Sequence, residues 1–159
     1  WGKATAVTLV PITGHSAVGY EDGQVRYWNA MHFELISEFG PGHSAGPILA
    51  VTAMPAEPSI ISGGMDGMIR KFDLSSGKQV WAADAGYGGA VRSVAVLPGS
   101  LHVVAGSDDG YVRIYDASSG NPHCQQNTGG GRVNAVAVTP VDEAQFVVGN
   151  QDGVARVFR

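Results

Sequence analysis

The sequence is poor in charge and nearly free of cysteine. Charged residues make up 15% of its 159 residues, against about 25% in a typical soluble domain, so we expect much of the surface to be buried against another molecule. The net charge is −4 and no basic run is longer than Arg70-Lys71, which argues against nucleic acid as a partner. Cys124 is the only cysteine, so no internal disulfide forms and nothing requires an oxidising compartment.

Signals for export and for membrane insertion are missing as well. The sequence has no apolar run of 18 residues, no N-terminal signal peptide and no N-x-S/T glycosylation site. We therefore expect no membrane insertion and an intracellular location, cytoplasmic by default. No segment keeps a helical period for ten residues, so no substantial helix is expected either.

What the sequence does have is one motif written four times. In each copy an Asp is followed by Gly, then by Arg four residues after the Asp and by an aromatic residue six after it. Successive Asp residues are 44, 43 and 43 residues apart. The Asp residues are Asp22, Asp66, Asp109 and Asp152, the arginines Arg26, Arg70, Arg113 and Arg156, and the aromatics Trp28, Phe72, Tyr115 and Phe158.

Each copy predicts a tight turn followed by a strand. Asp-Gly is the strongest short-range turn signal, because Gly takes a positive φ without a Cβ clash. The alternation that follows places Val25, Ile69 and Val112 on one strand face and the Arg and the aromatic on the other. We expect each Arg to bond to its Asp and to stack on the aromatic. This structural interpretation is favoured over four cation or ligand sites, because such a turn prefers Asp before Gly.

Other positions repeat with the same period. A Pro closes the first strand of each copy, a Val lies four residues before it, and a Gly lies three residues before the turn Asp. These are Pro11, Pro55, Pro98 and Pro140; Val7, Val51, Val94 and Val136; and Gly19, Gly63, Gly106 and Gly149. The resulting repeats span about 1–41, 42–85, 86–128 and 129–159 in a single domain. Short strands at this period predict an all-β fold of about four radial, four-stranded antiparallel β-propeller blades.

The predicted strands fall between these markers. They are 4–10, 15–18, one ending at 29, and 33–39; then 48–54, 60–63, 68–73 and 78–83; then 91–97, 101–106, 111–116 and 122–127; and finally 133–139, 145–149 and 154–158. The last blade therefore lacks its outer strand.

The second repeat resembles the WD-repeat β-propellers. It carries Gly42-His43, Ser62, Asp66 and Phe72-Asp73, where that family has Gly-His, a Ser or Thr before the turn Asp, and Trp-Asp. That family also has a buried His–Ser–Asp–Trp hydrogen-bond chain, and no repeat of this sequence carries all four of its residues. Because Phe72 lacks an indole donor, aromatic packing is expected to substitute for the polar network. Since such rings usually have about seven blades, we expect the rest of a propeller, a second copy or another subunit to complete this one.

A second resemblance leaves an enzymatic alternative open. Asp73, Gly77 and Trp81 fall in the Asp-x-x-x-Gly-x-x-x-Trp pattern of quinoprotein-type propellers, which are often enzymes using pyrroloquinoline quinone. The third repeat has Cys124 and Gln125 in place of the Trp.

Catalytic, metal and cofactor sites are not predicted. His123-Cys124 has no further ligand at metal-binding spacing. Gly129–Gly131 is interpreted as a connector between blades. No Ser, His and acid are arranged as in a nucleophile elbow.

The remaining prediction is a non-catalytic scaffold that docks other proteins in a multisubunit complex, with part of a quinoprotein-like propeller enzyme as the alternative. The WD-repeat resemblance places peptide contacts at the end of the propeller that holds the Asp-Gly turns. The corresponding residues are Met65, Asp108 and Gln151 before the turns, Arg92, Arg132 and Asn134 at the inner strands, and Tyr87 on a connector. This mixture suits a polar peptide.

Overall fold

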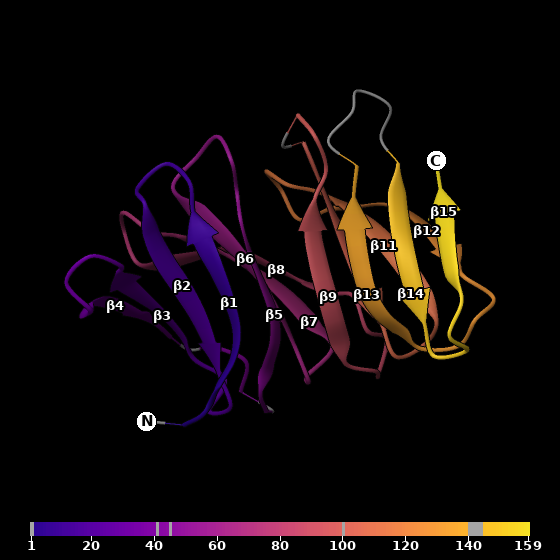
Figure 1. Cartoon of the computed structure of the whole chain (residues 1–159), viewed down its shortest axis with the longest axis horizontal. Coiled ribbons are helices and arrows are strands. Elements are labelled where there is room, and N and C mark those ends of the chain that lie inside the picture. The colour runs from indigo at the N-terminus through magenta and orange to yellow at the C-terminus, as the bar shows by residue number, and fades with distance from the viewer. Residues whose placement is uncertain (1, 41, 45, 100, 140–144) are drawn as a thin grey trace.

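The described residues of the computed structural model form fifteen strands in four antiparallel sheets (Figure 1). They are residues 2–40, 42–44, 46–99, 101–139 and 145–159. In every sheet the strands follow one another in sequence order, so each repeat folds into a meander of its own. We number these sheets blades 1 to 4. The predicted all-β fold is confirmed.

Strand bounds follow the repeat. Blade 1 holds β1 (Ala4–Val10), β2 (His15–Tyr20), β3 (Val25–Asn29) and β4 (Glu34–Phe39). Blade 2 holds β5 (Ile48–Ala53), β6 (Ser59–Gly64), β7 (Met68–Asp73) and β8 (Lys78–Asp84). Blade 3 holds β9 (Val91–Val96), β10 (His102–Ser107), β11 (Tyr111–Asp116) and β12 (Pro122–Asn127). Blade 4 holds β13 (Val133–Val138), β14 (Phe146–Asn150) and β15 (Ala155–Phe158).

Differences from the predicted strands are small. The second strand of blade 1 runs on to Tyr20, because its backbone still pairs with β1 there. Phe33 does not begin β4, since its φ of 56° places it in the left-handed region, within the preceding turn. Pro140 lies outside the described residues. As predicted, the described part of blade 4 has three strands, with β15 at its edge.

The blades stand in a row in sequence order. Their inner strands β1, β5, β9 and β13 lie side by side, each in contact with the next. The N- and C-termini lie at opposite ends of this row (Figure 1). None of the elements in the described structure is a helix able to span a membrane.

Three apolar clusters fill the three joints between neighbouring blades. The first joins Val25 and Phe39 of blade 1 to Ile48 and Phe72 of blade 2. The second joins blades 2 and 3, and the third joins blades 3 and 4. We call the side of a blade that faces the following blade its front, and the opposite side its back. The predicted alternation holds, because Val25, Ile69 and Val112 all lie on fronts and are buried.

A glycine marks the tightest point of each joint. A Cβ placed on Gly19 would lie 2.4 Å from Cγ2 of Ile48, and one on Gly63 would lie 2.7 Å from Cγ1 of Val91. At Gly106 the corresponding distance to Cγ1 of Val133 is 2.3 Å. These contacts are shorter than carbon atoms tolerate, so only glycine lets the next inner strand approach so closely.

Replacement of Gly63 by Val should therefore destabilise the fold. Overpacking of this kind costs about 1–3 kcal/mol of unfolding free energy, measurable by urea denaturation. Gly40→Ala is the control, because the nearest atom to its new Cβ is the side-chain oxygen of Gln24, at 3.2 Å. Equal stability of the two variants would contradict the proposed steric role.

Candidate functional site

Each Asp-Gly turn is held by its own Asp and Arg. Arg26, Arg70 and Arg156 lie 2.8, 2.7 and 2.6 Å from the carboxylates of Asp22, Asp66 and Asp152. Arg113 pairs with Asp109 in the same way. The second oxygen of each carboxylate accepts the backbone N–H two residues further on. The four carboxylates are thus engaged within their own turns.

The Asp–Arg pairs also change the pKa of the turn carboxylates. The hydrogen bond from Arg26 lowers the pKa of Asp22, and that from Arg156 lowers the pKa of Asp152. These carboxylates stay ionised at neutral pH, which keeps every turn closed by a charge-assisted bond.

The arginines stack on rings other than those expected. The Arg26 guanidinium lies 4.5 Å from the ring centroid of Tyr20, and that of Arg113 lies 4.3 Å from Tyr87 and 5.1 Å from Tyr111. Pairing with the turn Asp draws each guanidinium toward the turn. The repeated aromatic residue can instead contact the preceding blade. The Tyr115 hydroxyl of blade 3 donates a hydrogen bond to the Asp84 carbonyl of blade 2, at 2.7 Å.

A buried polar network closes blade 2. Nδ1 of His43 lies 2.6 Å from Oδ1 of Asp66, and Nε2 lies 2.8 Å from Oγ of Ser62. Aromatic packing therefore does not substitute for the network, although the rings of Phe72 and Phe39 pack at a tilt with centroids 5.7 Å apart. The backbone N–H of His43 also donates to the Gly23 carbonyl, at 2.8 Å, so the network ties blade 2 to the turn of blade 1.

This network is not a nucleophile site. Burial lowers the pKa of His43, which keeps its ring neutral at neutral pH. Its Nδ1 faces both Asp66 and Nη1 of Arg70, and its Nε2 faces the Ser62 hydroxyl. Ser62 is fully buried, and Arg70 already neutralises Asp66. The Ser–His–Asp order therefore has no access to a substrate, and its role is structural.

The other blades fill the same place with different polar groups. In blade 3, Nη1 of Arg113 donates to the Ala85 carbonyl at 2.8 Å. In blade 4, Nδ2 of Asn150 donates to Oγ1 of Thr128 at 2.7 Å, and both residues are buried. No motif in the sequence predicts that Thr128 and Asn150 pair here. Their only signal is position, since Thr128-Gly129 falls where the family has Gly-His.

The seven residues predicted to bind a partner lie at the turn end of the blades. There the N–H before each turn Asp donates to the carbonyl that precedes the inner strand, at 2.9 Å for Met65, Asp108 and Gln151. We call Met65, Tyr87, Arg92, Asp108, Arg132, Asn134 and Gln151 the turn-end face.

The centre of the turn-end face is an ionic cluster that spans blades 3 and 4. Asp108 accepts two hydrogen bonds from Arg92, and Nε of Arg132 lies 3.8 Å from the same carboxylate. Two guanidinium groups thus share one carboxylate, which leaves a net positive charge. Tyr87 is 65% exposed with a φ of 45°, and its ring rests on Arg113.

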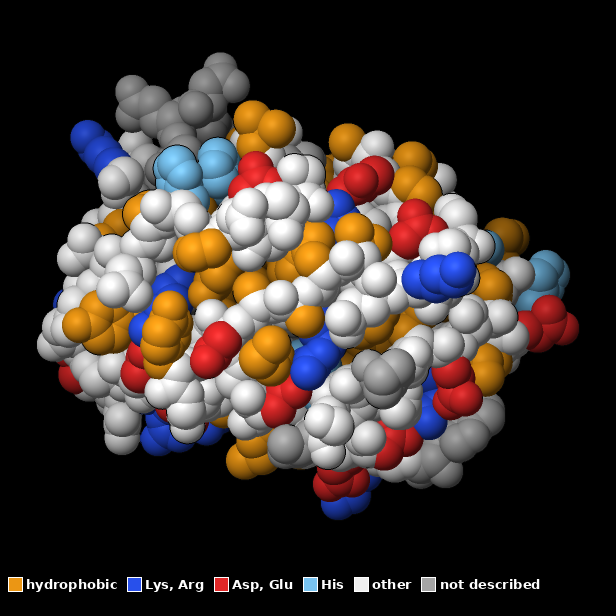
Figure 2. All heavy atoms as spheres, turned by 180° about the vertical axis from the view of Figure 1, so that it is seen from behind, with side chains coloured by type: hydrophobic (Ala, Val, Ile, Leu, Met, Phe, Trp, Pro, Cys, Tyr) orange, Lys and Arg blue, Asp and Glu red, His pale blue; other side chains and the backbone are white. Residues whose placement is uncertain are grey.

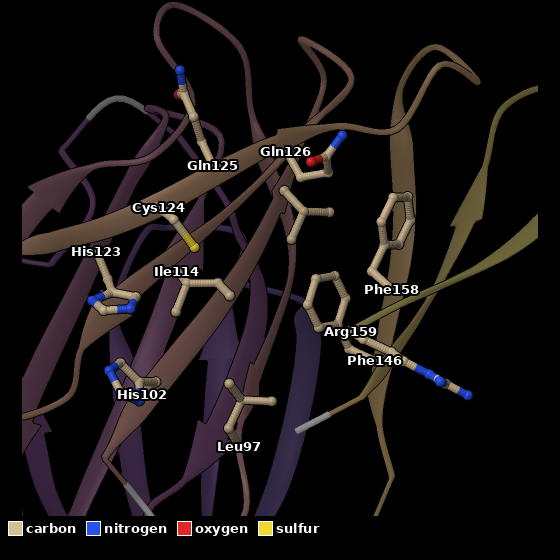
Figure 3. Close-up of a pocket in the computed structure, with 11 residues that line it drawn as sticks. Leu97, His102, Ile114, His123, Cys124, Gln125, Gln126, Phe146, Phe158 and Arg159 are labelled. Carbon is tan, nitrogen blue, oxygen red and sulfur yellow. The ribbon is translucent and has the colours of Figure 1, made fainter. Parts of the chain in front are cut away.

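A groove of about 420 Å³ opens between blade 3 and the edge of blade 4. Phe146 and Phe158, stacked with centroids 5.5 Å apart, stand across it from Ile114 and Gln126 (Figure 3). His102 and His123 lie on its wall with ring centroids 4.8 Å apart, a pairing that the sequence did not reveal. Within the described ranges no three His, Cys, Asp or Glu side chains gather as metal ligands would.

Charges of both signs lie on one face of the molecule. On the face shown in Figure 2, acidic and basic side chains alternate with apolar ones and form no single basic patch.

The His43 network predicts a stability that depends on pH. The unfolded histidine has a pKa of about 6.5 and burial lowers the folded value, so the unfolded state binds the extra proton first. The free energy of unfolding should therefore fall as the pH drops below about 6.5. The His43→Gln variant should be less stable than wild type at pH 8. Its free energy of unfolding, measured by urea titration, should change less than that of wild type between pH 7 and pH 5.5. His32→Gln, at an exposed turn residue, is the control. Parallel profiles for wild type and His43→Gln would refute the assignment.

Comparisons with known proteins agree with this architecture. The sequence profile of the WD40 family, described as WD domain, G-beta repeat, matches residues 33–73 and 79–116. No curated protein sequence matches the chain. Among solved structures, the crystal structure of the computationally designed Ika4 protein is similar, with a TM-score of 0.80 and 19% identity over 99% of this chain and 91% of that one.

The fold itself is widely shared, since 1486 solved chains match it, so the fold alone does not identify a function. The matched residues lie in blades 1 to 3, and the solved structure agrees with the blade architecture. The chain thus carries WD40 repeats on the fold of a β-propeller.

Proposed function

We propose that the chain is a non-catalytic scaffold within a larger protein assembly, and that its turn-end face binds an extended polar segment of a partner. WD40 repeats typically mediate contacts with other proteins. The observation that supports this use of the turn-end face is the exposed Tyr87 ring, held over Arg113 beside the cluster of Arg92, Asp108 and Arg132.

Tyr87 has the properties of a prepared anchor. A non-glycine residue with a positive φ is strained, and such strain persists where the surroundings hold it or function uses it. The hydrogen bond from its N–H to Oδ1 of Asp84, at 2.9 Å, fixes the connector that presents the ring. Tyr and Arg are also the residues on which interfaces most often depend.

The ionic cluster defines the chemistry of the partner. Arg92 and Arg132 share the single carboxylate of Asp108, so guanidinium N–H groups remain to meet an additional acceptor. A peptide carboxylate fits this excess of donors, because a guanidinium binds carboxylates through two parallel hydrogen bonds. Exposed Asn134 and Gln151 add amide groups that suit peptide backbone.

Packing accounts for the residue that carries the quinoprotein resemblance. Nε1 of Trp81 donates to the Ala117 carbonyl of blade 3 at 3.1 Å, and its ring lies against Gly120. Trp81 is therefore an interblade residue, which favours the scaffold over an enzyme.

The proposal includes additional blades that cover the two ends of the row. Val7 on the back of blade 1 is 69% exposed, and Val157 on the front of blade 4 is 61% exposed. Apolar strand faces of this kind are normally buried against a neighbouring blade.

Single substitutions test the docking face. A peptide selected from a random library against the purified chain should lose about 30-fold in affinity on Tyr87→Ala, the effect of about 2 kcal/mol at an anchor residue. Arg92→Ala and Arg132→Ala should weaken peptides that carry a carboxylate. Melting temperatures should stay unchanged, since all three side chains are at least partly exposed.

Leu101→Ala is the control, because Leu101 is 68% exposed, close to the 65% of Tyr87, and lies just before β10, at the end of blade 3 away from the turn-end face. Unchanged peptide affinity in all three turn-end variants would place the binding surface elsewhere.

A further inference from the structure

Two faces of the described structure have no blade against them, and they are the two halves of one joint. The back of blade 1 carries Ala4, Val7 and Trp28 at the positions that Ile48, Val51 and Phe72 hold in blade 2. Ile48 and Phe72 are buried against blade 1, whereas Ala4 and Val7 are exposed. Blade 1 therefore presents the shape of a joint that nothing in the row covers.

Gly149 is the complementary half on the front of blade 4. It aligns with Gly19, Gly63 and Gly106, each of which receives two β-branched side chains of the following blade. Among the described residues, only the Cβ of Ala135 comes within 4 Å of a Cβ placed on Gly149, at 3.9 Å. Its φ lies outside the left-handed region, and glycine within a strand costs about 0.5–1 kcal/mol relative to alanine. Close approach by another strand explains why glycine stands there.

The side chain that fits Gly149 is present in the same chain. At the three internal joints, the second β-branched side chain that contacts the glycine is that of Val51, Val94 or Val136. A methyl carbon of each lies 3.1, 3.2 or 2.9 Å, respectively, from a Cβ added to the glycine. Val7 holds the corresponding position on β1, where it pairs with Val18 as Val136 pairs with Val148. The back of blade 1 thus keeps one of the two β-branched contacts of a joint, Val7, with the smaller Ala4 in place of the other.

The rest of the two faces is compatible as well. In the third joint, Ile114 packs in one cluster with Phe146 and Phe158. Val157 holds the position of Ile114, and Trp28 that of Phe158. A hollow of about 470 Å³ lined by Val7, Val18, Tyr20, Trp28 and Phe33, among others, lies on the back of blade 1. Its lining residues carry no formal charge, so docking there buries no unpaired ion.

We infer that the occupant of each open face is a second copy of this chain, docked head to tail, with Ala4 and Val7 of one copy against Gly149 of the other. This rests on the proposal that additional blades cover the ends of the row. Two four-blade chains related by a two-fold axis give a ring of eight blades, within the range of about four to eight found in propellers. Head-to-tail contacts form a closed ring when the rotation between copies closes.

The mass of the chain in solution tests the inference. Analytical ultracentrifugation of the full chain should give twice the monomer mass of 16.5 kDa. Gly149→Val fills the space that Val7 of the other copy occupies, yet among the described residues only Ala135 lies within 4 Å of the added Cβ. Each joint should weaken about tenfold, so the two joints together raise the dimer Kd about 100-fold, while the circular dichroism spectrum of the monomer stays the same.

A charge-based pair of variants tests the same joint without overpacking. Val157→Glu should dissociate the dimer, and Val80→Glu should not, because Val80 is a comparably exposed valine on the outer strand β8. Val7→Glu and Val157→Glu should each be monomeric alone. A mixture of the two should recover a dimer, since one joint then has both faces intact; this recovery identifies a head-to-tail contact.

Three results would overturn the inference. They are a wild-type mass of 16.5 kDa at all concentrations, a dimer that Gly149→Val leaves unchanged, and a mass that grows beyond the dimer with concentration. If the wild type is monomeric but still binds the selected peptide through Tyr87, the head-to-tail dimer is wrong, whereas the proposed peptide-binding role of the turn-end face is supported.

Discussion

The arrangement of this protein depends on how closely one inner strand approaches the sheet before it. Each joint is a glycine met by two β-branched side chains, and the apolar clusters close around that contact. A meander of three or four short strands has little interior of its own, so nearly all of the burial comes from neighbouring blades. The low charge of the sequence follows from this, because both faces of an inner blade are covered.

Most of the fold was predictable because its signals are local. Asp-Gly turns, strand alternation and the prolines after the first strands each depend on only a few neighbouring residues. The strand bounds predicted from them lie within one or two positions of those observed. The apolar character of Phe33 predicts a strand position, but its backbone is in the left-handed region. Contacts between non-adjacent strands, such as His102 with His123, carry no periodic signal.

The site was predictable in position more than in chemistry. The repeat placed seven residues at the turn end, and the backbone pairing of Met65, Asp108 and Gln151 shows why such positions gather there. The shared carboxylate between Arg92 and Arg132 was not foreseen, since it depends on side chains from two blades. The stacking partners of the arginines likewise depend on which ring lies near the turn, as Tyr87 does for Arg113.

The polar groups that close the blades differ from repeat to repeat, and this difference distinguishes the blades from one another during folding. Tandem copies of similar sequence are prone to pair with the wrong neighbour. If blade 4 took the place of blade 2, Asn150 would meet the connector that carries His43, and Thr128 would lose its donor. Leaving such buried groups unpaired costs about 1–3 kcal/mol each. The divergence of the four repeats therefore adds an energetic cost to pairing a blade with the wrong neighbour, on top of the order that the short connectors impose.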